Sequence, residues 1–200
     1  SHYSGEKDVL FGVVVSGRPS TLAGVESMVG LFINTLPMRV KVSSSDSLLN
    51  WLKELQSQQI KLRQYEYSPL VQVQSWSDVQ NGSPLFESIV VFQNSLVDVC
   101  EPSNTNFQIN HINSLANSNY ALGFAVVPGS QFRLELRYDM SRFDPSTIKN
   151  ILAHIQTILN SMVAKLLDSN PIKLINELDI IDNTARQKLL VEFNNTNKRY

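Results

Sequence analysis

The stretch "VVVSGRPSTLAGVESMVGLFINTLPMRV", Val13–Val40, concentrates turn-forming and β-branched residues in one short part of the chain. A run of valines ends in Ser-Gly-Arg-Pro, which is typical of a strand that stops at a turn. Ser20 or Thr21 can cap the first free N–H groups of a helix, so a short helix is predicted that ends near Gly30. An apolar patch then closes on Asn-Thr-Leu-Pro, with Arg39 just beyond.

Outward from this stretch, apolar patterns predict the strands of a sheet. "DVLFGVVVSG", Asp8–Gly17, is a nearly continuous apolar run, as expected of an interior strand covered on both faces. "LFESIVVFQN", Leu85–Asn94, is a second β-rich run. "YALGFAVVPG" and "QFRLELRYDM" are predicted to form a hairpin joined by Pro128-Gly129, and apolar and charged residues alternate cleanly in its second strand.

Apolar residues at helical spacing predict helices between and after these strands. "SSSDSLLNWLKELQSQQIKLRQ" indicates an amphipathic helix with one buried face. "SPLVQVQSWSDVQNGSP" predicts a short helical piece that runs into a turn, although its alternating valines and glutamines also suit a strand. The clearest helix begins at Asp144-Pro145, an N-cap acid followed by proline, and extends to Leu166. The predicted fold class is therefore α/β, with a mixed β-sheet covered by helices.

Hydrophobic density falls after residue 170, so a domain is predicted over residues 1–170 and a linker over residues 171–200. One short helix is expected in the linker, capped by Asp182 or Asn183. The chain has 200 residues and 42% hydrophobic content, which is enough to bury a core and is the size of one domain.

Charge and hydropathy exclude two classes of partner. The chain has 17 Lys and Arg residues against 18 Asp and Glu residues, and no basic block that would neutralise phosphates. Its longest apolar runs fall short of the roughly 20 residues that span a bilayer, and the first residues lack a signal-peptide pattern. We therefore expect a soluble, cytoplasmic protein with no nucleic-acid partner and no membrane partner.

The residues alone do not indicate a catalytic or metal-binding site. Common motifs for nucleotide, zinc and serine chemistry are absent. The histidines, His2, His111 and His154, are far apart in the sequence, and none has a carboxylate at a recognised spacing. The single cysteine, Cys100, has no second thiol for a disulfide or a Cys-rich metal site. We expect no catalytic residue, no metal and no directly bound cofactor.

The order and spacing of several motifs nevertheless resemble nonribosomal peptide synthetase condensation domains. "DVLFGVVVSGRP" and "VESMVGLFINTLPMRV" resemble two successive core motifs of that family. Further agreement comes from "SLLNWLKELQSQQIKLRQYEYSPLVQVQSWS", "PLFESIVVFQN" and "LELRYDMSRFD". The last segment, "ELDIIDNTARQKLLVEFNNTNKRY", looks like the connector by which such a domain leads into an adenylation domain. The resemblance covers nearly the whole chain.

The resemblance implies a fold similar to chloramphenicol acetyltransferase, in which two α/β subdomains meet in a V around a channel. It also implies amide formation, in which an amine on one carrier-protein phosphopantetheine arm attacks a thioester on another. The family's catalytic H-H-x-x-x-D-G motif lies in its N-terminal half, and this sequence has no His-His pair. The chain is therefore expected to be the later, acceptor-side part of the C-terminal subdomain. We expect it to be inactive without the N-terminal half, and to have peptidyl carrier proteins and an adenylation domain as further partners.

The resemblance also assigns two groups of candidate site residues. Ser16, Gly17 and Arg18 match a turn that the family places at the substrate channel, where the serine hydroxyl could contact the pantetheine arm. The alternative is a strand-ending turn in which Arg18 makes a structural ion pair. The second group matches a motif that in the family forms the floor under the active site and bridges the two subdomains: Gly30, Phe32, Asn34, Thr35 and Arg39. For this group, scaffolding is favoured over chemistry.

Two other functions remain open for the chain. One is a noncatalytic docking module for carrier or adenylation domains. The other is part of a related epimerisation or acyltransfer domain, whose own motifs would lie upstream of Ser1. "GLFINTLPMRV" favours condensation because it closely matches that subgroup.

Overall fold

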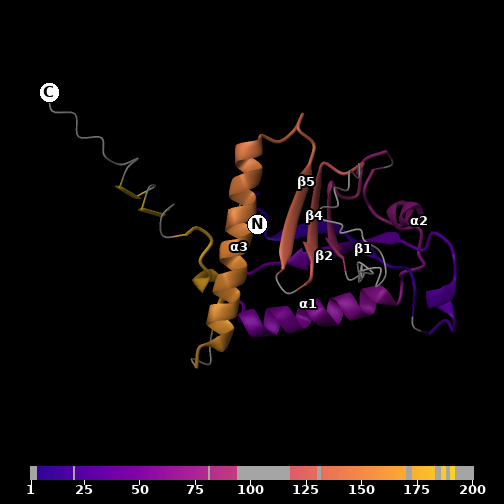
Figure 1. The fold of residues 1–200 in the computed structure, drawn as a ribbon, viewed down its shortest axis with the longest axis horizontal. Helices are drawn as coiled ribbons and strands as arrows, with labels where there is room; N and C mark the ends of the chain where they lie inside the picture. Colours follow the sequence, from indigo (N-terminus) through magenta and orange to yellow (C-terminus); the bar gives the residue numbers. More distant parts are fainter. Residues whose placement is uncertain are drawn as a thin grey trace, which may run out of the picture. The chain divides into compact units, whose positions relative to one another are not determined.

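The computed structural model describes residues 4–19, 21–80, 82–93, 118–129, 132–169, 173–182, 186–187 and 190–191 (Figure 1). The chain divides into two compact units. Unit 1 contains Ser1–Leu10, Met38–Glu66 and Phe143–Tyr200, and unit 2 contains Phe11–Pro37 and Tyr67–Arg142.

The described strands form one mixed five-stranded sheet in the order β2-β1-β3-β4-β5. β1 pairs with β3 and β3 with β4 in parallel, whereas β4 and β5 are antiparallel. The strands are β1 (Asp8–Val15), β2 (Asn34–Lys41), β3 (Ser88–Phe92), β4 (Leu122–Val127) and β5 (Arg133–Tyr138). β1 therefore lies inside the sheet, as its valine-rich run predicts, and β2 lies at an edge. The α/β fold class with a mixed sheet is confirmed.

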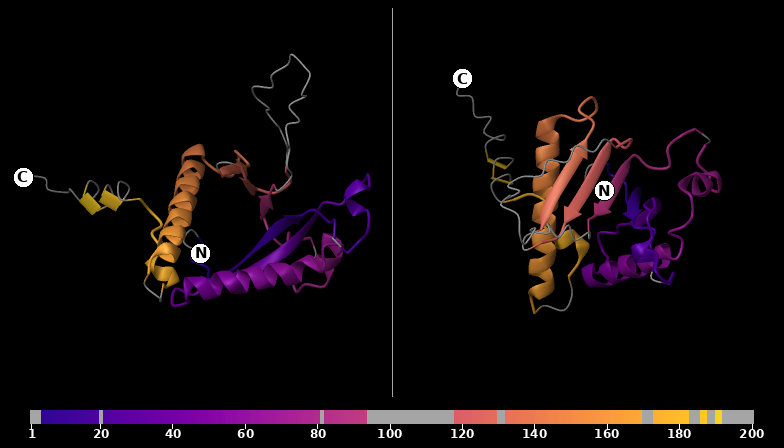
Figure 2. Two further views of the ribbon diagram at one scale, coloured as in Figure 1. Left: turned by 60° about the horizontal axis from the view of Figure 1, so that its bottom comes forward. Right: turned by 45° about the vertical axis from the view of Figure 1, so that its right-hand side comes forward.

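The predicted hairpin is confirmed by β4 and β5, which lie side by side in the right-hand view of Figure 2. Phe124 pairs with Leu136, and the charged residues of β5 alternate with apolar ones. Glu135 accepts from Arg133 Nε at 2.9 Å and lies 3.6 Å from Arg137 Nη2. The charged face of β5 is thus occupied by ion pairs within one strand.

In unit 1, α1 (Leu48–Arg63) is the predicted amphipathic helix. Leu48 is fully buried at its first turn. Trp51 Nε1 donates to the carbonyl of Lys41 at 3.0 Å, and Gln58 Nε2 donates to the carbonyl of Arg39 at 2.8 Å. These two bonds join the helix to the last residues of β2. They also satisfy carbonyl groups that an edge strand leaves without a partner in the sheet.

The long helix α3 (Pro145–Leu167) confirms the Asp144-Pro145 start. The Asp144 carboxylate accepts from the Ser146 N–H at 2.8 Å and from the Ser146 hydroxyl. These hydrogen bonds favour the ionised form and lower the pKa of Asp144. Ile148 is buried in the first turn, whereas Leu159 and Val163 further along the helix are exposed.

Residues 173–182 follow α3 along the chain (Figure 2, left). They hydrogen-bond to other parts of unit 1. Leu48 N donates to the Lys173 carbonyl at 2.8 Å, and Asp179 N donates to Ser161 Oγ at 3.0 Å. Arg186 N donates to the Asp182 carbonyl at 2.9 Å, at the place of the predicted short helix. Asn183, the other predicted cap, lies outside the described residues. The boundary near residue 170 stays a prediction.

The predicted helix after residue 20 is wrong. Only a three-residue 3-10 turn forms, η1 (Val25–Ser27), and its first flanking residue is Gly24, with φ +74° and no side-chain cap. Ser20 lies outside the described residues. The Arg18 guanidinium binds the carbonyls of Val25 and Met28 at the end of this turn, as described below. By contrast, α2 (Leu70–Ser75) confirms a short helix in the segment that also suited a strand.

Candidate functional site

The Ser16-Gly17-Arg18 turn follows the end of β1 and has a tightly constrained backbone. Gly17 has φ +63°, a left-handed conformation that L side chains rarely adopt. A Cβ at this position would also overlap the carbonyl oxygen of Phe32. Ser16 Oγ accepts from the Arg18 N–H at 3.4 Å, which closes the turn. Position 17 therefore requires glycine for two independent reasons, the positive φ and the lack of space for a Cβ.

The Arg18 side chain binds the segment that leads to β2. Its Nη1 donates to the Val25 carbonyl, and its Nη2 donates to the Met28 carbonyl at 2.9 Å. The guanidinium carbon lies 4.2 Å from the centroid of the Phe32 ring. Arginine suits this position because its planar fork reaches two acceptors while its face stacks on an aromatic ring.

Members of the two predicted residue groups thus lie in contact within unit 2. Gly17, Arg18, Gly30 and Phe32 all take part, since a Cβ on Gly30 would lie 3.1 Å from Phe32 Cε2. We call residues 25–33 the anchored loop. The alternative for Arg18 was a structural ion pair, but its partners within the described residues are carbonyl groups and an aromatic ring rather than a carboxylate.

The anchored loop presents apolar side chains to solvent. Val29, Leu31 and Ile33 are 102%, 93% and 66% exposed. They alternate with Gly30 and Phe32, which face the Arg18 side of the loop. Contiguous exposed apolar side chains of this kind mark surfaces that bind another protein or a ligand.

Asn34 and Thr35 begin β2 and belong to the regular sheet. Asn34 Oδ1 accepts from the Thr35 N–H at 2.9 Å, and its Nδ2 donates to the Ser68 carbonyl at 2.7 Å. Both bonds fix the point at which the anchored loop enters the strand. Pro37 follows within β2, where its missing N–H is tolerated because the strand lies at the edge of the sheet.

Arg39 belongs to unit 1, whereas the group around Arg18 belongs to unit 2. Its Nε and Nη2 donate to the two carboxylate oxygens of Asp8 at 2.9 and 2.8 Å. The hydrogen bond and the charge of Arg39 lower the pKa of Asp8, and Asp8 raises the pKa of Arg39. Because both side chains are exposed, the pair contributes little to stability.

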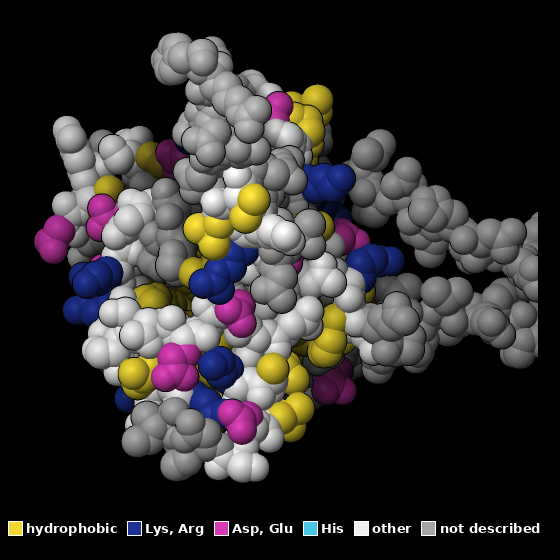
Figure 3. Space-filling model, turned by 90° about the vertical axis from the view of Figure 1, so that its left-hand side faces the viewer, with side chains coloured by type: hydrophobic (Ala, Val, Ile, Leu, Met, Phe, Trp, Pro, Cys, Tyr) yellow, Lys and Arg dark blue, Asp and Glu magenta, His cyan; other side chains and the backbone are white. Residues whose placement is uncertain are grey.

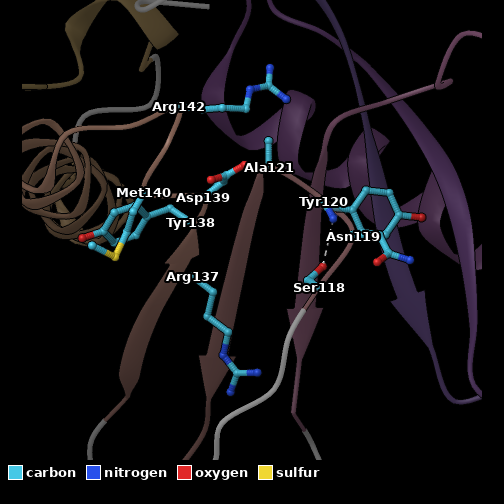
Figure 4. Close-up of a pocket in the computed structure, with 9 residues that line it drawn as sticks. All are labelled: Ser118, Asn119, Tyr120, Ala121, Arg137, Tyr138, Asp139, Met140 and Arg142. Atoms are coloured by element: carbon cyan, nitrogen blue, oxygen red, sulfur yellow. Dashed lines mark hydrogen bonds between the residues drawn. The ribbon is translucent and has the colours of Figure 1, made fainter.

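The sequence reasoning missed a pocket of about 430 Å³ where β4 begins and β5 ends. Figure 4 shows Arg142 and Arg137 at opposite ends of the group, with Asp139 between them. Asp139 accepts from the N–H and hydroxyl of Ser141, and these bonds lower its pKa. Arg142 pairs with Glu87, outside the lining. The signal in the sequence was the polar segment "DMSR" directly after a strand.

Charged side chains are mixed in sign. Arg133, Arg137 and Arg142 each pair with a glutamate, and Figure 3 shows Lys and Arg side chains among Asp and Glu side chains on the face it displays. Within the described ranges, no helix has the length and apolar character needed to cross a membrane. The same part of the chain has no group of three or more His, Cys, Asp or Glu residues that could hold a metal.

Of the three histidines and the single cysteine, the structure describes one histidine. His154 is half-buried on α3. Cys100, His111 and His2 lie outside the described residues.

The fold and the motifs match known proteins in three ways. The condensation-domain family model matches residues 1–190. One of the linear gramicidin synthase proteins of Brevibacillus parabrevis is 42% identical over 99% of this chain, and surfactin synthase subunit 3 from Bacillus subtilis is 34% identical over 97%. The chain spans 2% and 15% of those relatives.

Solved structures agree at the level of the fold. A four-domain nonribosomal peptide synthetase bound to AMP and glycine matches 92% of this chain and 15% of its own, at TM-score 0.70 and 18% identity. A variant of the starter condensation domain of rhizomide synthetase, in complex with C8-CoA, matches 90% of this chain and 40% of its own, at TM-score 0.65 and 20% identity. The fold is therefore the chloramphenicol-acetyltransferase-like fold of condensation domains. The chain belongs to the condensation-domain family of nonribosomal peptide synthetases.

Proposed function

We propose that this chain is the acceptor-side part of a condensation domain that forms peptide bonds between carrier-bound aminoacyl or peptidyl thioesters. The observation that carries the proposal is the contact between the Ser16-Gly17-Arg18 turn and the anchored loop. In a chain of this family, that contact joins the turn expected at the substrate channel to the loop expected to form its floor. The geometry thus supports one continuous wall, built by Gly17, Arg18, Gly30 and Phe32.

The reaction forms one bond and breaks one. The acceptor amine attacks the donor thioester carbonyl, a C–N bond forms and the C–S bond breaks. The amine loses a proton, and the sulfur of the donor arm gains one and leaves as a free thiol. The proton chemistry is assigned to the second histidine of the upstream H-H-x-x-x-D-G motif, so this chain is expected to be inactive alone. Its own contribution is the wall, with the exposed Ser16 hydroxyl available to the pantetheine arm.

The proposed partners follow from the same assignment. They are the N-terminal half of the condensation domain, two peptidyl carrier proteins and an adenylation domain, with residues 171–200 as the linker toward the last. The rhizomide synthetase domain was solved with C8-CoA, and CoA ends in the same phosphopantetheine thiol that a carrier protein bears. That complex supports the proposal that a carrier protein brings the phosphopantetheine arm to this fold and that the chain itself holds no cofactor.

A second candidate is a noncatalytic docking module. The exposed apolar side chains of Val29, Leu31 and Ile33 favour it, because such a surface binds a partner whether or not chemistry follows. The two candidate functions differ in whether adding the upstream half of the domain gives dipeptide formation.

The deciding experiment mixes this chain with the upstream half of the same condensation domain and two carrier proteins loaded with aminoacyl thioesters. Carrier-bound dipeptide is measured by mass spectrometry. The matched control is an upstream half whose second motif histidine is changed to alanine. Dipeptide that disappears in the control supports the condensation function. If the halves associate and both carriers are loaded, yet no dipeptide forms, the docking function replaces it.

A further inference from the structure

We infer that Arg18 is a positioning residue for the anchored loop rather than a ligand of the substrate arm. The inference rests on the proposed function, because it assigns the division of labour within the proposed wall. The Arg18 side chain makes several contacts with the loop at once. Two guanidinium nitrogens donate to carbonyls three residues apart, Val25 and Met28, and the guanidinium face covers Phe32.

The carbonyls that Arg18 binds lie at the end of η1. Met28 N donates to the Val25 carbonyl and closes η1, and the same carbonyl accepts from Arg18. The chain continues in extended form, with Met28 at φ −71° and ψ 132°, and Arg18 also binds the Met28 carbonyl. Arg18 thus holds the chain on both sides of the point where its direction changes.

Gly17 and Phe32 fix the other end of the loop. The Phe32 carbonyl lies where a side chain on residue 17 would begin, so the two backbones are in direct contact. The Phe32 ring is held beneath the guanidinium 4.2 Å away. Between these two fixed points, only Val29, Gly30 and Leu31 remain, and both apolar side chains point to solvent. The arginine thereby presents Val29 and Leu31 for contact.

A substrate ligand would use Arg18 differently. If Arg18 acted only on the phosphate of a pantetheine arm, its replacement would leave the loop of the isolated chain unchanged, because no arm is present there. A fork that holds two carbonyls and stacks on a ring depends on planar geometry, which lysine lacks. Arg18→Lys therefore separates the two roles, and Phe32→Leu tests the stack without changing charge. Arg133→Lys is the matched control, because Arg133 pairs with Glu135 on β5, outside the anchored loop.

The first measurement is hydrogen–deuterium exchange on this chain, without any partner. The reporters are the N–H groups of Val25, Ser27 and Met28, which donate to Leu22, Gly24 and Val25. We expect Arg18→Lys and Phe32→Leu each to accelerate their exchange about tenfold, with the double variant no faster than the faster single variant. Exchange in β4 and β5 should stay unchanged, as should every reporter in Arg133→Lys.

The second measurement is the dipeptide assay, titrated with the upstream half. We expect Arg18→Lys to need about tenfold more of the upstream half to reach half of the maximal rate. The maximal rate and the apparent KM for loaded carrier should stay within about twofold of those of the unaltered chain. A general loss of fold would lower the active fraction without this split.

Two results would overturn the inference. One is unchanged exchange at Val25–Met28 in Arg18→Lys. The other is a raised KM for carrier or a lower saturated rate with unchanged exchange, which would make Arg18 a substrate ligand. If the unaltered chain forms no dipeptide with an active upstream half, the proposed function fails, but the exchange result still decides whether Arg18 positions the loop.

Discussion

The carbonyl oxygen of Phe32 occupies the place where a side chain on Gly17 would begin. This contact brings together residues fifteen positions apart, one in a turn after β1 and the other just before β2. It explains why the turn requires glycine for space as well as for its positive φ. It also makes the turn and the anchored loop a single structural element.

Gly17→Ala should destabilise the chain by about 2 to 4 kcal/mol, because it combines left-handed strain with overlap of a backbone atom. Gly5→Ala is the matched control. Gly5 has φ +72° with nothing within 4 Å of an added Cβ, so it carries the strain alone and should cost about 1 kcal/mol. Urea unfolding of both variants measures the difference. Equal losses would contradict a role for the Phe32 contact.

Asn34→Ala should cost about 1 to 2 kcal/mol, because it removes the donor to Ser68 and the acceptor for the Thr35 N–H. Asn34→Asp keeps the acceptor but places a carboxylate against the Ser68 carbonyl. It should therefore be less stable than Asn34→Ala at neutral pH and recover as acid protonates the new carboxyl. Urea midpoints at pH 7 and pH 4 test this order. A pH-independent difference between the two variants would show that the Ser68 contact is unimportant.

Asp144→Asn should reduce the stability of α3 in a pH-dependent manner. The Ser146 hydroxyl and N–H lower the pKa of Asp144 below 3.8, its value without these partners. A carboxylate with a lowered folded pKa stabilises the fold above the unfolded pKa, and the contribution is lost as pH falls through the folded pKa. The difference in urea midpoint between the unaltered chain and the variant should therefore be largest at neutral pH and shrink as pH falls through the folded pKa of Asp144. A difference that persists unchanged at the lowest pH would contradict the assignment.

Local patterns in the sequence were sufficient for α1, α3 and the β4–β5 hairpin. In each, the residues that determine the structure lie within the element, as with Asp144-Pro145 at the start of α3. The helix predicted after residue 20 was wrong, and the carbonyl groups of that segment bind Arg18, which lies outside it. A pattern read along the segment does not contain that information.

The resemblance predicted a list of candidate site residues but not their arrangement. The resemblance placed Arg39 in one group with Gly30 and Phe32, whereas the structure pairs it with Asp8 in unit 1. That pair joins residues far apart in sequence on β2 and β1, so its existence depends on strand order. The pocket near Asp139 was missed for a similar reason, because its lining comes from both strands of the hairpin.

Ser161→Ala should loosen residues 173–182 without disrupting α3. The buried Ser161 hydroxyl accepts from the Asp179 N–H at 3.0 Å, and alanine removes that acceptor while keeping a good helix former. We expect a loss of about 1 kcal/mol and about fivefold faster amide exchange at Asp179, with exchange in α3 unchanged. Asn160→Ala, an exposed neighbour on α3, is the control and should leave Asp179 unaffected. If Asp179 exchanges at the same rate in both variants, the Ser161 contact has no role in holding residues 173–182, and other contacts such as their bonds to residues 44–48 hold them instead.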